Sequence, residues 1–435
     1  MSAFSSLNRS QKEAIGLLQV GTFLEYFDLM LYVHMAVLLN ELFFPKTDPH
    51  TTALLSAFAF CSTFVLRPFG ALIFGWIGDN IGRKTTVIIT TLFMSVSCMV
   101  MANLPIYAQI GITATWTVTL CRIIQGLSSM GEIMGAQIYV TEITKPPAQY
   151  IAVSFVSIAS AFGSMAALGI ASLVTHFQFN WRLAFWMGAA IAVIGSVARI
   201  RLRETPEFIK MKIRKIKKQQ ENTWDKNLED TWGKWRTSAA YFFVFCGWPL
   251  TFYISYMYFN PTLKELCHYT SEDMIFHNFL LSITLCVSSI SWTCLATKMH
   301  PIKITKLKGR IGFVSALVLP FLISVANTPL SIFAIQVLLL NFTLGETPSF
   351  AIFIKHFPTL KRFTLTSFLY ALTRAMMYIV TSFGLVYLTG SLGHWGIWVV
   401  MIPVTTGFLW GIHHFEKLEN LNKTLNMKHS TLKTA

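Results

Sequence analysis

The feature of this sequence that most restricts its fold is the recurrence of long apolar runs along nearly the whole chain. A helix needs about 20 apolar residues to cross the roughly 30 Å hydrocarbon layer of a bilayer. Each crossing segment should be helical, because lipid offers the backbone no hydrogen-bond partners. We therefore expect an all-α integral membrane protein with twelve transmembrane helices, at 15–43, 51–77, 85–103, 110–140, 150–175, 182–202, 237–260, 275–297, 310–327, 330–354, 364–389 and 395–414.

One long polar segment divides these spans into two sets of six. The division predicts an N-terminal six-helix bundle over 1–202, a basic linker over 203–236, a C-terminal six-helix bundle over 237–414 and a polar tail over 415–435. Membrane proteins built from two related bundles often hold their ligand at the interface between them. The second-half stretch KITKLKGR (303–310) is predicted to be a loop that corresponds to the charged turn between spans 2 and 3.

The charges of the chain indicate how it is oriented. The sequence is 54% hydrophobic, only 13% charged, and has a net charge of +15. Such a basic balance would suggest nucleic acid in a soluble protein, but here the basic residues lie between apolar runs, and we expect no nucleic-acid partner. If the N-terminus is cytoplasmic, 29 of the 35 Lys and Arg residues lie on that side and three lie outside. This asymmetry predicts that both termini are cytoplasmic.

The linker contains a basic stretch, KMKIRKIKKQQ (210–220), whose apolar residues recur at helical spacing. Such a segment can lie on an anionic membrane surface. An ordinary basic cytoplasmic loop is the interpretation that we favour from the sequence.

Span 1 carries two acidic residues inside an apolar run. Gly21, Glu25, Asp28 and Tyr32 are spaced so that they share one helical face. A charged acid at the centre of a bilayer costs on the order of 2.5 kcal/mol or more, so such residues line cavities, pair or hold a proton. We predict that at least one of the two acids exchanges a proton. The alternative is that both are structural partners of arginines elsewhere.

Two further sets of polar residues lie within spans. In span 4, Arg122, Gln125, Gly126, Ser129 and Glu132 are predicted to cluster on one side of the helix. In the second half, Glu346 and Arg374 are isolated at overlapping depths, which permits either a structural pair or contact with a solute. Gly345 and Pro348 flank Glu346 and are predicted to interrupt span 10, as happens where backbone lines a transport cavity.

Span 7 is rich in aromatic residues, ten of them between Tyr241 and Phe259. Aromatic faces can form a cage around a quaternary ammonium group. We favour the other interpretation, in which these rings face lipid and form an interfacial belt.

The turn after span 2 carries a resemblance to a known family. Residues 67–84, RPFGALIFGWIGDNIGRK, resemble the loop between helices 2 and 3 of the major facilitator superfamily, and the RPFG segment resembles its metabolite:proton symporter family. Transporters for proline and betaine, alpha-ketoglutarate and shikimate belong to that family. The polar patterns of spans 1 and 4 also resemble it, and the resemblance covers residues 15–210.

The resemblance implies a function and a gate. It implies alternating-access, proton-coupled import of a small polar organic solute, an organic acid or a zwitterion. Asp79 should bind backbone donors at the start of span 11, and Arg83 should pair with Glu142. Family members continue after this acid with an Arg-Gly pair, whereas this chain has Gln149-Tyr150, so the charge lattice should lack one cation.

The remaining expectations concern partners and location. We expect a monomer in a bacterial cytoplasmic (inner) membrane, with a small-molecule substrate, the proton as coupling ion and the lipid bilayer as partners. No cofactor, metal or enzymatic activity is expected, because no nucleophile, phosphate-binding or metal-ligand motif occurs and the seven cysteines lack metal spacing. The alternatives are a proton-independent facilitator or exchanger, and a sensor that binds solute without transporting it.

Overall fold

The computed structural model describes residues 7–44, 64–177, 179–220, 235–342 and 344–434. Within these residues the chain is helical and contains no strand. The predicted beginning of span 2, at 51–63, lies outside the described residues. All-α architecture is therefore confirmed for the part of the chain that the structure describes.

In the part of the first half that the structure describes there are six long helices. They are α2 (Arg9–Phe43), α4 (Arg67–Asn80), α5 (Arg83–Asn103), α7 (Ile112–Ile143), α8 (Ala148–His176) and α9 (Arg182–Arg199), with the short α6 (Tyr107–Ile110) between α5 and α7.

Six further crossings form the second half, and some of them are built from several pieces. They are α11 (Trp235–Tyr253), which continues into η2 (Ile254–Tyr258) and α12 (Asn260–Leu266), then α13 (Ser271–Leu295), α14 (Pro301–Val325), α15 (Pro329–Asn341) with α16 (Phe350–Lys355), α17 (Arg362–Ile379) with η3 (Val380–Leu385) and α18 (Val386–Leu392), and, after η4 (Gly393–Trp395), α19 (Gly396–Thr434).

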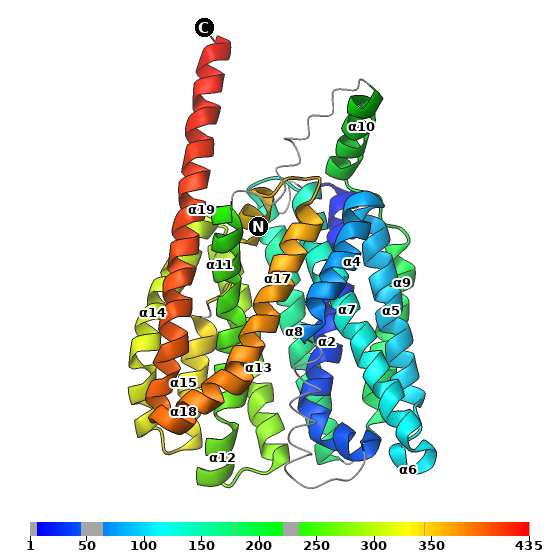
Figure 1. Ribbon diagram of the computed structural model, residues 1–435, viewed down its shortest axis with the longest axis vertical. Helices are drawn as coiled ribbons and strands as arrows, with labels where there is room; N and C mark the ends of the chain where they lie inside the picture. The colour runs from blue at the N-terminus through cyan, green and yellow to red at the C-terminus, as the bar shows by residue number, and fades with distance from the viewer. Residues whose placement is uncertain (1–6, 45–63, 178, 221–234, 343, 435) are drawn as a thin grey trace.

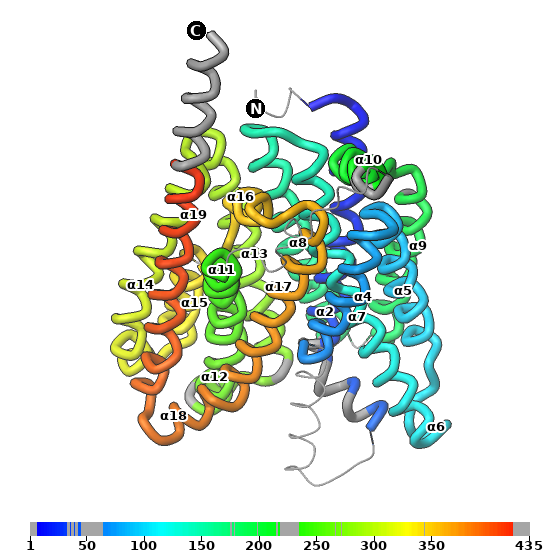
Figure 2. The backbone as a smooth tube through the Cα atoms, turned by 45° about the horizontal axis from the view of Figure 1, so that its top comes forward, coloured from blue at the N-terminus to red at the C-terminus, as the bar shows by residue number. Residues whose placement is uncertain are grey.

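The two halves stand side by side as two bundles (Figure 1). The start of α2 and the C-terminal part of α19 lie at the same end of the molecule, which we call the terminal end, and α6, α12 and α18 lie at the opposite, far end (Figures 1 and 2). The bundles meet along two helix pairs, α4 with α17 and α8 with α13. The expected arrangement of two six-helix bundles is confirmed.

Glycines allow the close contact between α4 and α17. A Cβ atom on Gly75 would lie 2.7 Å from Cα of Thr364, and one on Gly78 would lie 2.5 Å from Cδ2 of Phe363. In lipid, small residues of this kind let helix backbones approach and pack. The helices therefore meet here at a distance that no larger residue permits.

Apolar length and composition agree with a membrane location. Among the described residues, seven helical segments are long and apolar enough to cross a membrane, and one of them, 362–420, contains both span 11 and span 12. Two shorter apolar helices lie at 182–197 and 329–341. The protein is a multi-pass membrane protein, and α4 and α7, which are not among these segments, complete its bundles.

One predicted loop is wrong, and the structure adds detail to the predicted tail and linker. The stretch 303–310 is not a loop but part of the first turns of α14, which begins at Pro301, a position where the missing N–H of proline costs nothing. The predicted tail from 415 continues α19 as a helix. The predicted linker contains α10 (Pro206–Gln220), and its residues 221–234 lie outside the described residues.

Candidate functional site

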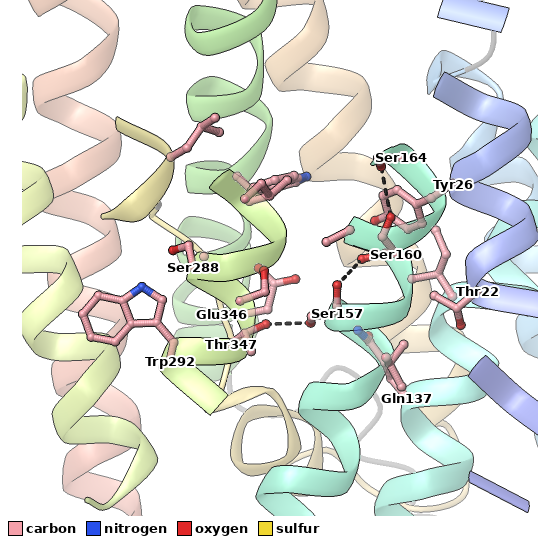
Figure 3. Close-up of a pocket in the computed structure, with 18 of the residues that line it drawn as sticks. Thr22, Tyr26, Gln137, Ser157, Ser160, Ser164, Ser288, Trp292, Glu346 and Thr347 are labelled. Atoms are coloured by element: carbon pink, nitrogen blue, oxygen red, sulfur yellow. Dashed lines mark hydrogen bonds between the residues drawn. The ribbon is translucent and has the colours of Figure 1, made fainter. Parts of the chain in front are cut away.

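A polar cavity lies between the two bundles, lined by residues of both (Figure 3). One wall belongs to the first half, where Ser157, Ser160 and Ser164 follow one another along α8. Ser160 and Ser164 donate hydrogen bonds to carbonyls of their own helix at 2.7 and 3.0 Å. Their oxygen lone pairs therefore remain available to donor groups in the cavity. The other polar and aromatic lining residues are Thr22, Tyr26, Gln137, Trp248, Ser288, Ser289, Trp292, Lys308, Glu346, Thr347, Tyr370 and Arg374.

Arg374 brings a buried positive charge to this cavity. Its guanidinium carbon lies 3.3 Å from the ring centroid of Tyr370, and its Nη2 lies 4.0 Å from Oε1 of Glu346. Its Nη1 is buried and has no hydrogen-bond partner among the described residues. Glu346 and Arg374 are therefore neighbours, as predicted. Their separation of 4.0 Å is at the upper limit for an ion pair, and Nη1 of Arg374 is left without a partner among the described residues.

Lys308 brings a second positive charge, which sequence analysis had assigned to a loop. Its Nζ donates to the carbonyl of Thr347 at 3.3 Å and lies 5.6 Å from the ring centroid of Trp292. The residue is buried and lines the cavity. Among the described residues that line it, the cavity thus holds two cations, Lys308 and Arg374, against one acid, Glu346.

The predicted interruption of span 10 is confirmed and forms part of the cavity wall. α15 ends at Asn341, α16 begins at Phe350, and Gly345, Glu346 and Thr347 line the cavity from the segment between them. The Thr347 hydroxyl lies 2.7 Å from that of Ser157, which is a hydrogen bond between the two halves (Figure 3).

The acids of span 1 are buried outside the cavity lining, and each contacts an arginine. Glu25 Oε1 lies 3.3 Å from Nη2 of Arg67. Asp28 Oδ2 lies 3.1 Å from Nη1 of Arg122, and its Oδ1 accepts from Gln125 at 3.0 Å.

Tyr32 completes this group, because its ring centroid lies 3.8 Å from the guanidinium carbon of Arg122. Both acids of span 1 therefore form ion pairs with arginines, as expected if their role is structural. The geometry also provides two buried carboxylates whose protonation would release an arginine.

Glu132 does not share this environment. Arg122 and Glu132 are ten residues apart, so at about 100° per residue they point in different directions around α7. Glu132 Oε2 lies 2.5 Å from Nη1 of Arg199, and Thr91 also donates to Glu132. Arg199 donates in addition to the carbonyls of Leu17 and Leu18 at 3.2 and 3.0 Å.

Arg199 is fully buried at the end of α9. Because its contacts reach α2, α5 and α7 from the end of α9, this cluster ties together four helices of the first half.

The turn after α4 forms a charge lattice at the terminal end. Asp79 accepts hydrogen bonds from the backbone N–H groups of Phe363 and Thr364 at 3.1 and 2.8 Å and from the Thr364 hydroxyl at 2.8 Å. Arg83, which is fully buried, donates to Asp79 at 2.8 Å and lies 3.4 Å from Glu142. These are the contacts that the resemblance implied, and those of Asp79 join the two halves.

This chain has Gln149-Tyr150 where family members have an Arg-Gly pair. An arginine from the other half of the protein, Arg362, provides a cation to the lattice instead. Arg362 Nη1 lies 3.2 Å from Oε1 of Glu142 and 2.7 Å from Oε2 of Glu207. Gln149 instead donates to the carbonyls of Thr141 and Thr144 at 2.5 and 2.8 Å, near the end of α7. Sequence analysis missed this role of Arg362, although its place directly before span 11 was a usable signal.

Five of the ten aromatic residues of span 7 are buried and one, Phe243, is exposed, so the prediction that these rings face lipid is wrong for the buried five. Tyr241, Phe245, Phe252 and Tyr256 all lie inside the protein, and Trp248 lines the cavity. Phe252 and Tyr378 pack edge to face, with ring centroids 6.3 Å apart, and Tyr378 also contacts Phe64 of the first half at 4.0 Å. These rings join the halves toward the far end.

Comparison with known proteins decides the family. The sequence model described as Major Facilitator Superfamily matches residues 18–384. The chain belongs to the major facilitator superfamily. Two similar superfamily members are the inner membrane metabolite transport protein YhjE of Escherichia coli, 36% identical over 50% of this chain, and a proline/betaine transporter of Salmonella typhimurium, 29% identical over 64% of this chain. The matches span 50% and 57% of the length of these relatives.

Solved structures show the same superfamily fold. The proton:xylose symporter XylE, bound to 6-bromo-6-deoxy-D-glucose, aligns over 94% of this chain and 95% of its own with a TM-score of 0.75 at 12% identity. The human organic anion transporter MFSD10 aligns over 94% of this chain and 100% of its own with a TM-score of 0.66 at 13% identity. At these identities the likeness concerns the fold alone.

Proposed function

We propose that this protein is a secondary transporter that moves a small polar organic solute by alternating access. The observation that carries the proposal is the charged cavity between two bundles, with the Asp79 lattice joining them at one end and the aromatic contacts of Phe64 and Tyr378 at the other. A site enclosed in this way opens to one side only when one set of contacts breaks. The names of its relatives, a metabolite transport protein and a proline/betaine transporter, support the same function.

The cavity favours a solute that carries a carboxylate. Arg374 has a free guanidinium nitrogen, and a guanidinium binds carboxylate in bidentate geometry. Lys308 adds a second donor, while Glu346 and the indole rings of Trp248 and Trp292 offer partners for a positively charged group. The substrate class is therefore a small organic acid or a zwitterion.

We assign the terminal end to the cytoplasm of a bacterial cell, because the basic residues gather there. The conformation described is then closed toward the cytoplasm, since the lattice holds α4 against α17 at this end. Cysteine labelling tests the orientation. A thiol placed at Lys217 should react only from the cytoplasm and one at Lys264 only from outside, and the reverse pattern would contradict the assignment.

Proton coupling is proposed to run through Asp28 or Glu25. Protonation of Asp28 would weaken its contact with Arg122, and protonation of Glu25 would weaken its contact with Arg67. Either event would loosen the packing of α2 within the first bundle. The second candidate is a proton-independent exchanger, which is favoured by the pairing of both acids with arginines.

Uptake into proteoliposomes tests these proposals together. Labelled organic acids, proline and betaines are offered with and without an inwardly directed proton gradient. We expect accumulation of a carboxylate solute that depends on the gradient, and Asp28→Asn should abolish accumulation but retain exchange, because an amide keeps hydrogen bonds but carries no proton. Gradient-driven accumulation that survives neutralisation of each acid in turn would show that neither acid is an indispensable proton carrier. Uptake that does not respond to the gradient in the unmodified protein would favour the exchanger. No saturable uptake of any solute would contradict transport.

A further inference from the structure

The helix α10 (Pro206–Gln220) carries an apolar stripe that no described residue covers. Ile209, Ile213 and Ile216 follow one another at helical spacing and are 46%, 52% and 48% exposed. Exposed basic residues flank the stripe, namely Lys210, Lys212, Arg214 and Lys217. The helix stands beyond the bundle at the terminal end (Figure 1). It is therefore a strongly amphipathic and strongly basic element at one boundary of the membrane-crossing part.

The first turn of α10 is bonded to the charge lattice. Glu207 Oε2 lies 2.7 Å from Nη1 of Arg362, and the ring of Phe208 lies 5.1 Å from the guanidinium carbon of Arg83. Directly before the helix, the Thr205 hydroxyl donates to Glu142 at 2.6 Å and accepts from the Phe208 N–H at 3.3 Å. The beginning of the helix is thus fixed at the level where the bundle ends, and the isoleucine stripe starts one residue later.

We propose that α10 docks on the anionic phospholipid surface of the bilayer. An apolar stripe inserts among acyl chains and headgroups, while the flanking lysines and arginines bind lipid phosphates, which is how basic amphipathic helices bind membranes. A second copy of α10 fits the stripe less well, because it would bring two sets of like charges together. Charge complementarity therefore selects an anionic lipid surface as the occupant.

Docking has a consequence for the lattice. Glu207 loses conformational freedom when it pairs with Arg362 of the other half, and a docked helix has already lost part of that freedom. Anionic lipid therefore stabilises the closed terminal end through Glu207.

Hydrogen exchange of the full chain in nanodiscs tests the docking. One set of nanodiscs contains phosphatidylcholine alone, and the other contains equal parts of phosphatidylcholine and phosphatidylglycerol. We expect slower exchange of amides 209–217 in the anionic nanodiscs, and loss of this protection in Ile213→Asp.

The double variant Lys212→Gln with Lys217→Gln should weaken docking about 30-fold. Each basic residue contributes about 1 kcal/mol to binding an anionic surface, and each 1.4 kcal/mol corresponds to about tenfold in affinity. The control pair, Lys298→Gln with Lys303→Gln, removes two exposed basic residues near the terminal ends of α13 and α14 and should leave the protection unchanged.

Three outcomes would overturn docking on lipid. Equal exchange of α10 in both lipids would exclude it, and so would protection that the control pair removes equally. Protection that grows with the number of chains per nanodisc would identify a second copy as the occupant instead.

Glu207→Gln tests the link to the lattice separately. This variant should retain lipid-dependent protection of 209–217 but lose lipid-dependent protection of 359–364, because the bond to Arg362 is weakened while the stripe is intact. If 359–364 still responds to lipid in Glu207→Gln, the link through Glu207 is wrong.

Discussion

For Arg374, in the cavity, the structure distinguishes between the two roles that the sequence left open. Arg374 lines the polar cavity, its Nη1 has no hydrogen-bond partner among the described residues, and its contact with Glu346 is 4.0 Å long. A structural partner of a buried charge would be held more tightly, because an unpaired buried charge is costly. Arg374 is therefore better placed to bind a solute carboxylate than to stabilise Glu346.

This geometry predicts the result of a double-mutant experiment. Arg374→Gln should abolish binding of carboxylate solutes, and the double variant with Glu346→Gln should express and purify normally but remain inactive. Size-exclusion profiles and solute binding measure the two effects. Recovery of transport in the double variant would show instead that the two residues form a structural pair.

A second prediction concerns Lys308. Lys308→Gln should weaken binding of a carboxylate solute by about 10- to 150-fold, since a hydrogen bond to a charged group contributes about 1.5–3 kcal/mol and each 1.4 kcal/mol is about tenfold. Lys306→Gln is the matched control, because Lys306 lies two residues earlier on α14 and pairs with Glu416 at 2.7 Å. Calorimetric affinity measures both. Equal effects of the two variants would mean that the cavity position of Lys308 is unimportant.

Glu132 illustrates a buried pair with a different task. Glu132→Gln leaves the fully buried Arg199 without its carboxylate, and breaking such a pair costs about 3–5 kcal/mol. We expect a clear fall in the melting temperature of the detergent-purified protein. Glu265→Gln, at an exposed position, should leave it unchanged. If the Glu132→Gln protein is as stable as the unmodified protein but has lost proton coupling, Glu132 takes part in transport and its role is not only structural.

At the scale of elements, apolar length predicted most spans, and polar residues caused the errors. In a sequence, a lysine that faces an internal polar cavity looks the same as a lysine in a loop, so Lys308 and the first turns of α14 were assigned to the aqueous side. The burial of Arg199 against α2, α5 and α7 was likewise not predicted. The partners of a buried charge come from distant helices, and their identity depends on packing that no local pattern contains.

The interruption of span 10 was predictable because its cause is local. Gly345 and Pro348 disfavour helix on their own, whatever packs around them. The contact of Asp79 with the start of α17 came from the family resemblance, since 284 residues separate Asp79 from Phe363. Arg362 as replacement for the missing cation was not predicted, because the family pattern directed attention to positions 149 and 150.

The crossing of α4 and α17 gives a prediction at this scale. Gly75→Ala would place a methyl group 2.7 Å from Cα of Thr364, so the helices must separate at the terminal end. We expect this variant to favour the conformation open at the terminal end and to transport slowly. Gly16→Ala is the control, because nothing lies within 4 Å of the added atom. Spin-label distances across the terminal end report the change, and distances equal to those of the unmodified protein would contradict it.

At the scale of the whole molecule, alternation is a shift between states that differ by a few kcal/mol. Asp79 accepts three hydrogen bonds from the other half, and hydrogen bonds to charged groups contribute about 1.5–3 kcal/mol each. Asp79→Asn should therefore open the terminal end and slow turnover more than it weakens solute binding. Separate measurements of uptake rate and affinity decide this, and unchanged turnover would count against a gate role.

The two ends of the molecule close with different chemistry. Buried charges and hydrogen bonds join the halves at the terminal end. Toward the far end the buried contact is aromatic, from Phe64, Phe252 and Tyr378, and the polar contact of His176 with Glu272 is solvent-exposed. Opening the far end exposes apolar surface and so raises the heat capacity, while exposure of polar groups at the terminal end lowers it. Apolar association weakens on cooling. The balance between the two open states is therefore a curved function of temperature, and cold shifts it toward opening of the far end.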